Sequence, residues 1–287
     1  LQEQDRYKNE FLATLAHELR NPLAPIGAGI SLLEKKQDPD TQSKVINTMK
    51  RQVGHMTKMI NDLLDVSRIT RGKIKLEKEN LAIQKVIKNA VETCTTIIEE
   101  NKHNLSLNLP EDFLWINGDA TRLSQIFSNI LNNASKYTDP GGKIEILVTK
   151  DKEWVSVKIK DNGLGIPENK LNQIFDMFTQ VDAHSTHTKG GLGIGLTLVQ
   201  RLVLLHGGKI KVRSDGQGEG TEFEVLLPLV QKDIETADGK QEDAKENMGN
   251  QQKILVVDDN PDILTMYRIL LETEGYEVET SADGKET

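Results

Sequence analysis

The chain has 287 residues, of which 37% are hydrophobic and 28% charged, and its formal net charge is -8 at pH 7. This composition excludes a fibrous or wholly disordered protein, and the length allows two or more domains. The acidic balance argues against a nucleic-acid partner, because phosphate backbones are bound by clusters of Lys and Arg.

The cysteine count and the absence of apolar runs indicate the cellular compartment. A single cysteine, Cys94, excludes an internal disulfide and is expected to be a small buried residue. No run reaches the roughly 18 apolar residues that span a bilayer, and the first residues are too polar for a signal peptide. We therefore expect a cytoplasmic segment. It begins without Met and inside a helical pattern, so an upstream region that carries a membrane anchor is kept as an alternative.

Residues 1 to about 36 and about 41 to 70 predict two helices joined by QDPD, in which Pro39 and its acidic neighbours end one helix and start the next. Apolar residues in the second helix recur four and three apart and form a face about twice as wide as a simple seam. One neighbouring helix cannot cover this face. Residues 1–75 are therefore predicted to form a helical hairpin that pairs with a second copy as a dimeric four-helix bundle.

The first helix carries a polar cluster in the sequence HELRNPL. His17 and Asn21 are four residues apart and share a helix face, whereas Glu18 reaches the imidazole only with a suitable rotamer. Pro22 and Pro25 remove backbone donors, so the helix is expected to bend just after His17. A mostly neutral imidazole can attack with one nitrogen while a carboxylate holds the proton on the other. A solvated surface histidine is the alternative.

From about residue 80 the pattern predicts an α/β sandwich with several antiparallel strands. Helical patterns cover residues 81–102, 120–137 and 196–207. Strand patterns cover residues 104–110, 113–117, 143–150, 154–161, 209–214 and 221–229. Asp119 is expected to be an N-cap, and His206 a packing and capping residue at a helix end.

The helix from Ala120 to about Tyr137 places a polar row beside its apolar stripe. The row contains Arg122, Asn129, Asn133 and Lys136. Amide carbonyls are hard oxygen donors that suit Mg²⁺, and a lysine can neutralise phosphate. A phosphate-bearing ligand is therefore one interpretation of the row, and a solvated helix face is the other.

Two glycine-rich stretches follow. Asp161 ends a strand and can accept a hydrogen bond from an exocyclic amine such as that of adenine, while Gly163 and Gly165 permit close approach to a flat ligand. The sequence KGGLGIGL precedes a helix whose N-terminal N–H groups favour phosphate. A polar loop precedes these glycines, which argues against a Rossmann domain, and no P-loop motif occurs. HRD and DFG are also missing, which argues against a eukaryotic-type protein kinase.

The last part of the chain divides into two segments. Residues 231–252 have almost no large apolar side chains and predict a flexible linker. Residues 253–287 begin a β-α-β unit of a doubly wound α/β fold. We expect this fragment to be unfolded, because about 35 residues of such a fold cannot bury a core.

Six motifs in order resemble the H, N, G1, F and G2 boxes and the Gly-Thr motif of bacterial sensor histidine kinases. They are HELRNPL, NNASKYT, DNGLGI, FDMF, KGGLGIGL and GEGT. The resemblance implies a dimerisation and phosphoacceptor domain over 1–75 and an ATP-binding domain over 76–230, of the superfamily shared with gyrase and heat-shock chaperones. KILVVDDNPDIL resembles the start of a receiver domain, which implies a hybrid kinase.

The resemblance also implies roles for individual residues. His17 is implied as the phosphoacceptor, Glu18 as its general base or orienting acid, and Asn21 as a residue that places water for dephosphorylation. Asn133 is implied to bind Mg²⁺ with the ATP phosphates. Nucleotide contacts are implied for Asn129, Asn133, Lys136, Tyr137, Asp161, Gly163, Gly165, Gly191, Gly193, Gly195, Leu196 and Thr221.

Phe175 and Phe178 would anchor a lid over roughly residues 176–191. Metal binding by His184 and His187 is not expected, because no third ligand is near them in sequence.

Taken together, the motifs predict a kinase that phosphorylates its own His17 from Mg-ATP and passes the phosphoryl group to an Asp on a receiver, either of a response regulator or of its own full-length chain. A phosphatase or nucleotide-binding scaffold for a regulator is one alternative. A conformational ATPase that uses the hairpin only to dimerise is another.

Overall fold

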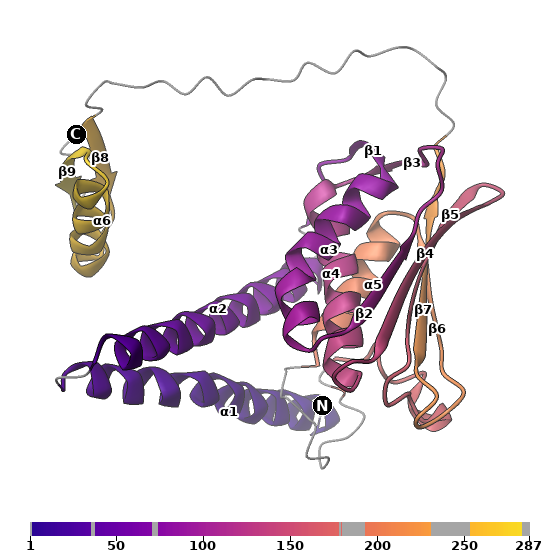
Figure 1. Ribbon diagram of the computed structural model, residues 1–287, viewed down its shortest axis with the longest axis horizontal. Coiled ribbons are helices and arrows are strands. Elements are labelled where there is room, and N and C mark those ends of the chain that lie inside the picture. Colours follow the sequence, from indigo (N-terminus) through magenta and orange to yellow (C-terminus); the bar gives the residue numbers. More distant parts are fainter. Residues whose placement is uncertain are drawn as a thin grey trace. The chain divides into compact units, whose positions relative to one another are not determined.

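The structure, a computed structural model, describes residues 2–35, 38–70, 74–177, 179, 193–230 and 253–282. The chain divides into two compact units, Leu1–Asp233 and Ile234–Thr287 (Figure 1). No helix within the described ranges is long and apolar enough to cross a membrane.

The first unit begins with a helical hairpin of α1 (Gln2–Leu33) and α2 (Pro39–Thr70). The Asp38 carboxylate accepts a hydrogen bond from Thr41 N at 2.9 Å, which satisfies a donor in the first turn of α2. Gly29 permits close packing, because a Cβ there would lie 2.7 Å from Met49 Sδ. α1 stays helical through Pro22 and Pro25, so the bend expected after His17 does not interrupt the helix.

A five-stranded sheet of order β2-β4-β5-β7-β6 forms the centre of the second part of this unit. Its strands are β2 (Asn104–Asn108), β4 (Lys143–Asp151), β5 (Trp154–Asp161), β6 (Lys209–Arg213) and β7 (Thr221–Pro228). β2 pairs with β4 in parallel, and the other pairs are antiparallel. A small second sheet joins β1 (Glu79–Ala82) to β3 (Trp115–Gly118). β1 was not predicted, and the helix expected from residue 81 begins at Ile83 instead.

Three helices pack beside the sheet (Figure 1). They are α3 (Ile83–Glu100), α4 (Ala120–Tyr137) and α5 (Gly195–Leu205), and a short 3-10 turn, η1, covers Glu168–Lys170. The α4 side chains Ile126, Phe127 and Ile130 are fully buried in one core with alternate residues of β4, β5 and β7. The apolar faces of the strands and of the helices thus pack together in a single layer.

Both capping predictions for α4 and α5 are confirmed. Asp119 Oδ1 accepts from Arg122 N at 3.1 Å as the N-cap of α4, and Asp119 N donates to His206 Nε2 at 3.1 Å. His206 Nδ1 in turn donates to Leu202 O at 2.8 Å. Burial lowers the pKa of His206, although its bond to the Leu202 carbonyl opposes this change. A neutral imidazole therefore ties the end of α5 to the start of α4.

The expected burial of Cys94 is also confirmed. Its side chain is 1% exposed on α3, and Sγ lies 3.6 Å from Ser128 O on α4. Burial raises the pKa of the thiol to about 11. Cys94 is therefore an inert packing residue at the interface between these helices.

The second unit contains β8 (Lys253–Val257), α6 (Pro261–Thr273) and β9 (Glu277–Ser281), with the two strands in parallel. Asn260 caps α6 by accepting from Asp262 N at 2.9 Å. The sequence predicts an unfolded fragment, whereas these local interactions give residues 253–281 a β-α-β form. The expected lack of a core is seen nonetheless, because α6 has no buried residue and Met266 is 70% exposed.

We predict that Phe127→Ala lowers the free energy of unfolding by about 3–5 kcal/mol, because a fully buried phenylalanine leaves a cavity in the core. Phe113→Ala removes the same atoms from a side chain that is 59% exposed and is the matched control, with an expected loss of about 1 kcal/mol or less. Urea unfolding followed by the fluorescence of Trp115 and Trp154 measures both. Equal losses would contradict the assigned core.

Candidate active site

The central feature of the candidate site is the buried carboxylate of Asp161, at the end of β5. Asp161 Oδ1 accepts from Gly163 N at 2.9 Å and from Thr221 N at 3.2 Å. Thr221 is its partner across the β5–β7 ladder. Burial raises the pKa of Asp161, and the two backbone donors partly offset this effect. With Oδ1 held in this way, Oδ2 is the oxygen that can serve a ligand.

Glycines around Asp161 allow backbone segments to touch. A Cβ on Gly163 would lie 2.3 Å from Tyr137 O, and one on Gly220 would lie 2.1 Å from Asp161 O. Gly165 has φ +68°, and a Cβ on this residue would lie 2.0 Å from Gly216 O. Gly163 and Gly165, which are predicted to let a ligand approach, also permit close contact with Tyr137 O and Gly216 O in the structure, and their role toward a ligand stays a prediction. Gly220 was not singled out, although it is part of the GEGT motif.

Asn129, on α4, carries a second sign of a ligand. Asn129 is 6% exposed, and its Nδ2 has no hydrogen-bond partner among the residues that the structure describes. A buried amide N–H without an acceptor is unfavourable, and a ligand oxygen or a bound water would satisfy it. Nearby on α4, Asn133 is half-buried, and Lys136 Nζ lies 3.1 Å from Tyr137 Oη and 4.7 Å from the centre of its ring.

The predicted polar row on α4 is only partly a ligand face. Arg122 turns to α2 of the hairpin and pairs with Asp65 at 2.6 Å. The row therefore separates into a hairpin contact at the start of α4 and the candidate ligand residues Asn129, Asn133 and Lys136 further along. No group of three or more His, Cys, Asp and Glu side chains that could hold a metal occurs within the described ranges.

The second glycine-rich stretch begins α5. Gly193 has φ +64°, Gly195 is the first residue of the helix, and Leu196 packs against the core. Thr197, which sequence reasoning missed, donates from Oγ1 to Phe175 O at 2.8 Å and so joins α5 to the FDMF segment. Gly191, Phe178, His184 and His187 lie outside the described residues, as does most of the expected lid.

His17 lies on α1 and is exposed to solvent. Asn21 Nδ2 lies 3.4 Å from His17 Nδ1, so the two share a helix face as their spacing predicts. Glu18 is half-buried beside them. The structure thus separates the candidate residues into an exposed imidazole on the hairpin and a buried acid with its glycine loops at the end of the sheet.

Two protein families match the chain. Residues 7–72 match the His Kinase A (phospho-acceptor) domain, and residues 118–231 match the histidine kinase-, DNA gyrase B- and HSP90-like ATPase. His17 lies in the first region, and Asp161, Asn133 and Thr221 lie in the second.

Individual relatives agree with these matches. The circadian input-output histidine kinase CikA of Synechococcus elongatus is 36% identical over 229 residues, 77% of this chain and 30% of CikA. The signal transduction histidine-protein kinase BarA of Escherichia coli is 36% identical over 239 residues, 79% of this chain and 26% of BarA. The chain thus spans less than a third of the length of each of these relatives.

A solved structure of the histidine kinase ThkA in complex with the response regulator protein TrrA aligns with a TM-score of 0.57 and 25% identity, over 80% of this chain and 64% of that one. Over residues 7–72 and 118–231, the chain therefore belongs to the sensor histidine kinases, which are protein-histidine kinases.

Proposed function

We propose that this chain phosphorylates its own His17 from Mg-ATP and that the phosphoryl group then passes to an Asp on a receiver domain. The observation that carries the proposal is the buried Asp161, held through one oxygen by Gly163 N and Thr221 N inside a region that matches an ATPase family. An exposed imidazole in a region that matches a phosphoacceptor family supplies the other reactant.

In this proposal, Asp161 Oδ2 accepts a hydrogen bond from the amino group of adenine. Such an acceptor in a buried position discriminates strongly against bases that lack the donor. Gly163 N and Thr221 N hold the carboxylate in position, and Gly165 lies two residues further along the same turn. Lys136 and Tyr137 bind the nucleotide from α4, and Gly191, Gly193, Gly195 and Leu196 line its phosphates.

Asn133 would hold Mg²⁺ together with the ATP phosphates, and Asn129 would support it. The fit to the ion rests on the amide oxygens of the two side chains. The buried Nδ2 of Asn129, which has no partner among the described residues, would donate to a phosphate oxygen or to a water. When bound, Mg²⁺ offsets the negative charge of the phosphates.

The transfer step uses groups of this chain. A neutral His17 nitrogen attacks the γ-phosphorus in line with the leaving oxygen, so that an N–P bond forms while the P–O bond to ADP breaks. The proton on the other imidazole nitrogen passes to Glu18, which is adjacent in sequence and half-buried. The alternative function is a phosphatase, in which Asn21 places a water that dephosphorylates a regulator. The contact between Asn21 and His17 favours this alternative.

A receiver is proposed as the partner because ThkA, which this chain resembles, was solved in complex with a response regulator protein. The receiver can belong to a separate regulator or to the full-length chain. In support of the second, Asp258 and Asp259 follow β8 and match the acidic start of a receiver. We propose that these steps take place in the cytoplasm, where ATP is available.

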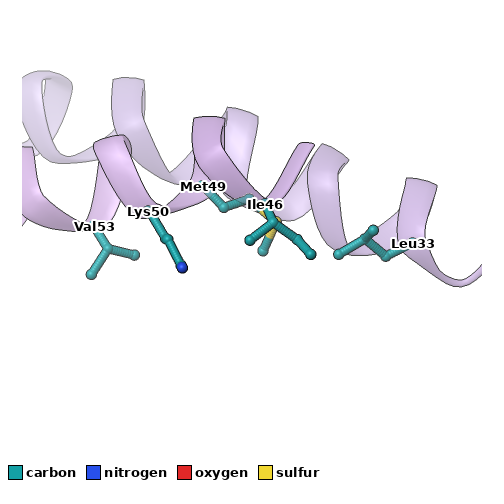
Figure 2. Close-up of a pocket in the computed structure, with 5 residues that line it drawn as sticks. All are labelled: Leu33, Ile46, Met49, Lys50 and Val53. Carbon is teal, nitrogen blue, oxygen red and sulfur yellow. The ribbon is translucent and has the colours of Figure 1, made fainter. Parts of the chain in front are cut away.

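A second copy of the hairpin is proposed to cover its exposed apolar face. Ile46, Val53 and Ile60 recur every seven residues on α2 and are 41–51% exposed. Figure 2 shows Ile46, Lys50 and Val53 projecting from the same side of α2, with Leu33 of α1 beside them. These residues and Met49 line an apolar groove. A heptad repeat of exposed aliphatic residues is typical of a helix-bundle interface.

The first test incubates the full chain with Mg²⁺ and γ-labelled ATP. We expect label that survives base and is lost in acid, and none of it in His17→Ala. His55→Ala, which removes another exposed imidazole from the hairpin, is the matched control and should retain the label. Absence of label with nucleotide bound would favour the phosphatase or scaffold. ATP turnover that persists in His17→Ala would favour a conformational ATPase.

Asp161→Asn should stabilise the nucleotide-free chain at pH 7 and weaken ATP binding by roughly 10- to 100-fold. Asn keeps an acceptor for Gly163 N and Thr221 N but removes the buried charge. Because burial raises the native pKa of Asp161 above 3.8, the wild-type carboxylate opposes folding at higher pH. The stability difference should therefore shrink as the pH falls towards 3.8.

Urea unfolding between pH 4 and 7 and titration with ATP measure these two effects. Asp215→Asn, at an exposed acid, should change neither. A variant that binds ATP as tightly as the wild type would contradict the assigned role of Asp161.

Val53→Asp should weaken dimerisation at least about a hundredfold, because it buries an unpaired charge in the proposed interface. Arg51→Asp introduces the same side chain two residues away, at an exposed position outside the Ile46–Val53–Ile60 repeat, and should leave the dimer intact. Sedimentation equilibrium of both variants distinguishes them. A wild-type chain that is monomeric at micromolar concentration would rule out this interface.

A further inference from the structure

Two loops meet beside the buried carboxylate of Asp161. The first loop follows β5 and carries DNGLGI, whereas the second connects β6 to β7 and carries GEGT. Gly220 N donates to Gly163 O at 3.1 Å, and Gly218 N donates to Leu164 O at 2.6 Å. The backbones of the two loops are therefore joined directly.

Ser214, the first residue after β6, adds a side-chain bridge between the same loops. Its Oγ accepts a hydrogen bond from Ile166 N at 2.9 Å and donates to Gly220 O at 2.7 Å. Gly216 O lies further away, at 3.3 Å, so the single hydroxyl proton is directed to Gly220 O. One half-buried hydroxyl thus accepts from the first loop and donates to the second.

The peptide unit between Gly220 and Thr221 links this bridge to Asp161. The unit is trans and planar, so its C=O and N–H groups point in opposite directions. Its carbonyl accepts from Ser214 Oγ, and its N–H donates to Asp161 Oδ1 at 3.2 Å. Rotation of the unit would therefore disturb both bonds together. A hydrogen bond to the carbonyl also polarises the unit and strengthens donation by its N–H.

This chain of bonds is shielded from solvent. Gly220 is buried, and Thr221 and Asp161 are 8% and 6% exposed. Hydrogen bonds influence one another more strongly in such an interior than in water. Burial raises the pKa of Asp161, and the Thr221 N–H is one of two backbone donors that lower it. The bond from Ser214 should therefore help to keep the carboxylate charged and in one orientation.

We propose that Ser214 is a positioning residue for adenine recognition, which orients the Gly220–Thr221 peptide unit so that this unit holds Asp161 with Oδ2 free for the exocyclic amine of the base. The proposal rests on the proposed ATP-dependent function. It assigns part of the preference for adenine to a hydroxyl that acts through Asp161. A base without the amine gains nothing from a well-placed acceptor, so loss of Ser214 should reduce discrimination as well as affinity.

The test titrates the full chain with ATP and with inosine triphosphate, which has a carbonyl where adenine has its amine. Ser214→Ala should weaken ATP binding about five- to tenfold, as expected for the loss of one hydrogen bond. Binding of inosine triphosphate should weaken by about twofold at most. Ser156→Ala removes another buried hydroxyl, whose bond goes to Glu224 on the sheet, and is the matched control that should change neither.

Two outcomes of this titration would overturn the proposal. Unchanged ATP affinity in Ser214→Ala would show that the hydroxyl does not support recognition. Equal losses for both nucleotides would indicate general damage to the pocket, because an effect through Asp161 must favour the base that carries the amine.

Ser214→Cys separates the hydrogen bond from the shape of the side chain. A thiol occupies similar space but is only a weak donor and a weak acceptor. The cysteine variant should therefore lose ATP affinity as the alanine variant does. Wild-type affinity in Ser214→Cys, together with a loss in Ser214→Ala, would assign the effect to packing and overturn the proposal.

A double variant tests whether Ser214 acts through Asp161. In the Asp161→Asn background, Ser214→Ala should weaken ATP binding by about twofold at most, because the charge that Ser214 helps to position is already absent. Losses that multiply as those of independent sites would contradict the assigned connection.

Hydrogen exchange of the nucleotide-free chain measures the positioning without ATP. The amide of Thr221 should exchange about five- to tenfold faster in Ser214→Ala, because its peptide unit is held less firmly, and at the wild-type rate in Ser156→Ala. If the wild type binds no ATP, the proposed function fails by itself. The exchange comparison then decides the role of Ser214 alone: faster exchange supports it and unchanged exchange overturns it.

Discussion

Burial of the apolar stripe of α4 against the five-stranded sheet is the interaction on which the other features depend. Leu123, Ile126, Phe127 and Ile130 are all fully buried, so the rotation of the helix about its axis is fixed. The same rotation presents Arg122 to the hairpin at one end and Asn133 and Lys136 to the candidate ligand site at the other. The packing of one helix therefore positions both a residue that contacts the hairpin and residues of the candidate ligand site.

In the turn after β5, by contrast, the local conformation is unfavourable by itself. A carboxylate is buried, Gly165 and Gly220 adopt left-handed backbone conformations, and the Nδ2 of Asn129 finds no acceptor within the described part of the chain. The β5–β7 ladder supports this arrangement by pairing Asp161 with Thr221. Groups held in this way by a stable sheet are characteristic of binding sites, in which stability is lower than packing alone would allow.

The sequence predicted the features that depend on nearby residues. The α4 helix lies at Ala120–Tyr137 as expected, because its apolar period and the N-cap Asp119 are both local signals. The contact between Arg122 and Asp65 joins residues 57 apart and has no periodic signal, so Arg122 was grouped with the ligand row. The four residues of β1 are too few to show a period of two, and they merged with the following helix pattern.

Other differences between prediction and structure arise because a motif does not identify the neighbours of its residues in the folded chain. The motif DNGLGI located the candidate site, but it did not show that the missing Cβ of Gly163 makes room for the Tyr137 carbonyl. The two prolines of α1 remove donors, yet the remaining hydrogen bonds of a long helix keep the chain helical around them. In both cases the residue type was informative, and its structural reason depended on neighbours that only the folded chain brings together.

The burial of Cys94 makes this chain suited to spectroscopic study of domain movement. A thiol that is 1% exposed, with a pKa of about 11, presents almost no thiolate to reagents in solution. Cysteines introduced on the hairpin and on the outer face of the sheet can therefore carry fluorescent dyes or spin labels, while Cys94 stays unmodified in the native core. Distances between α2 and the sheet can then be followed in a chain whose interior packing is that of the wild type.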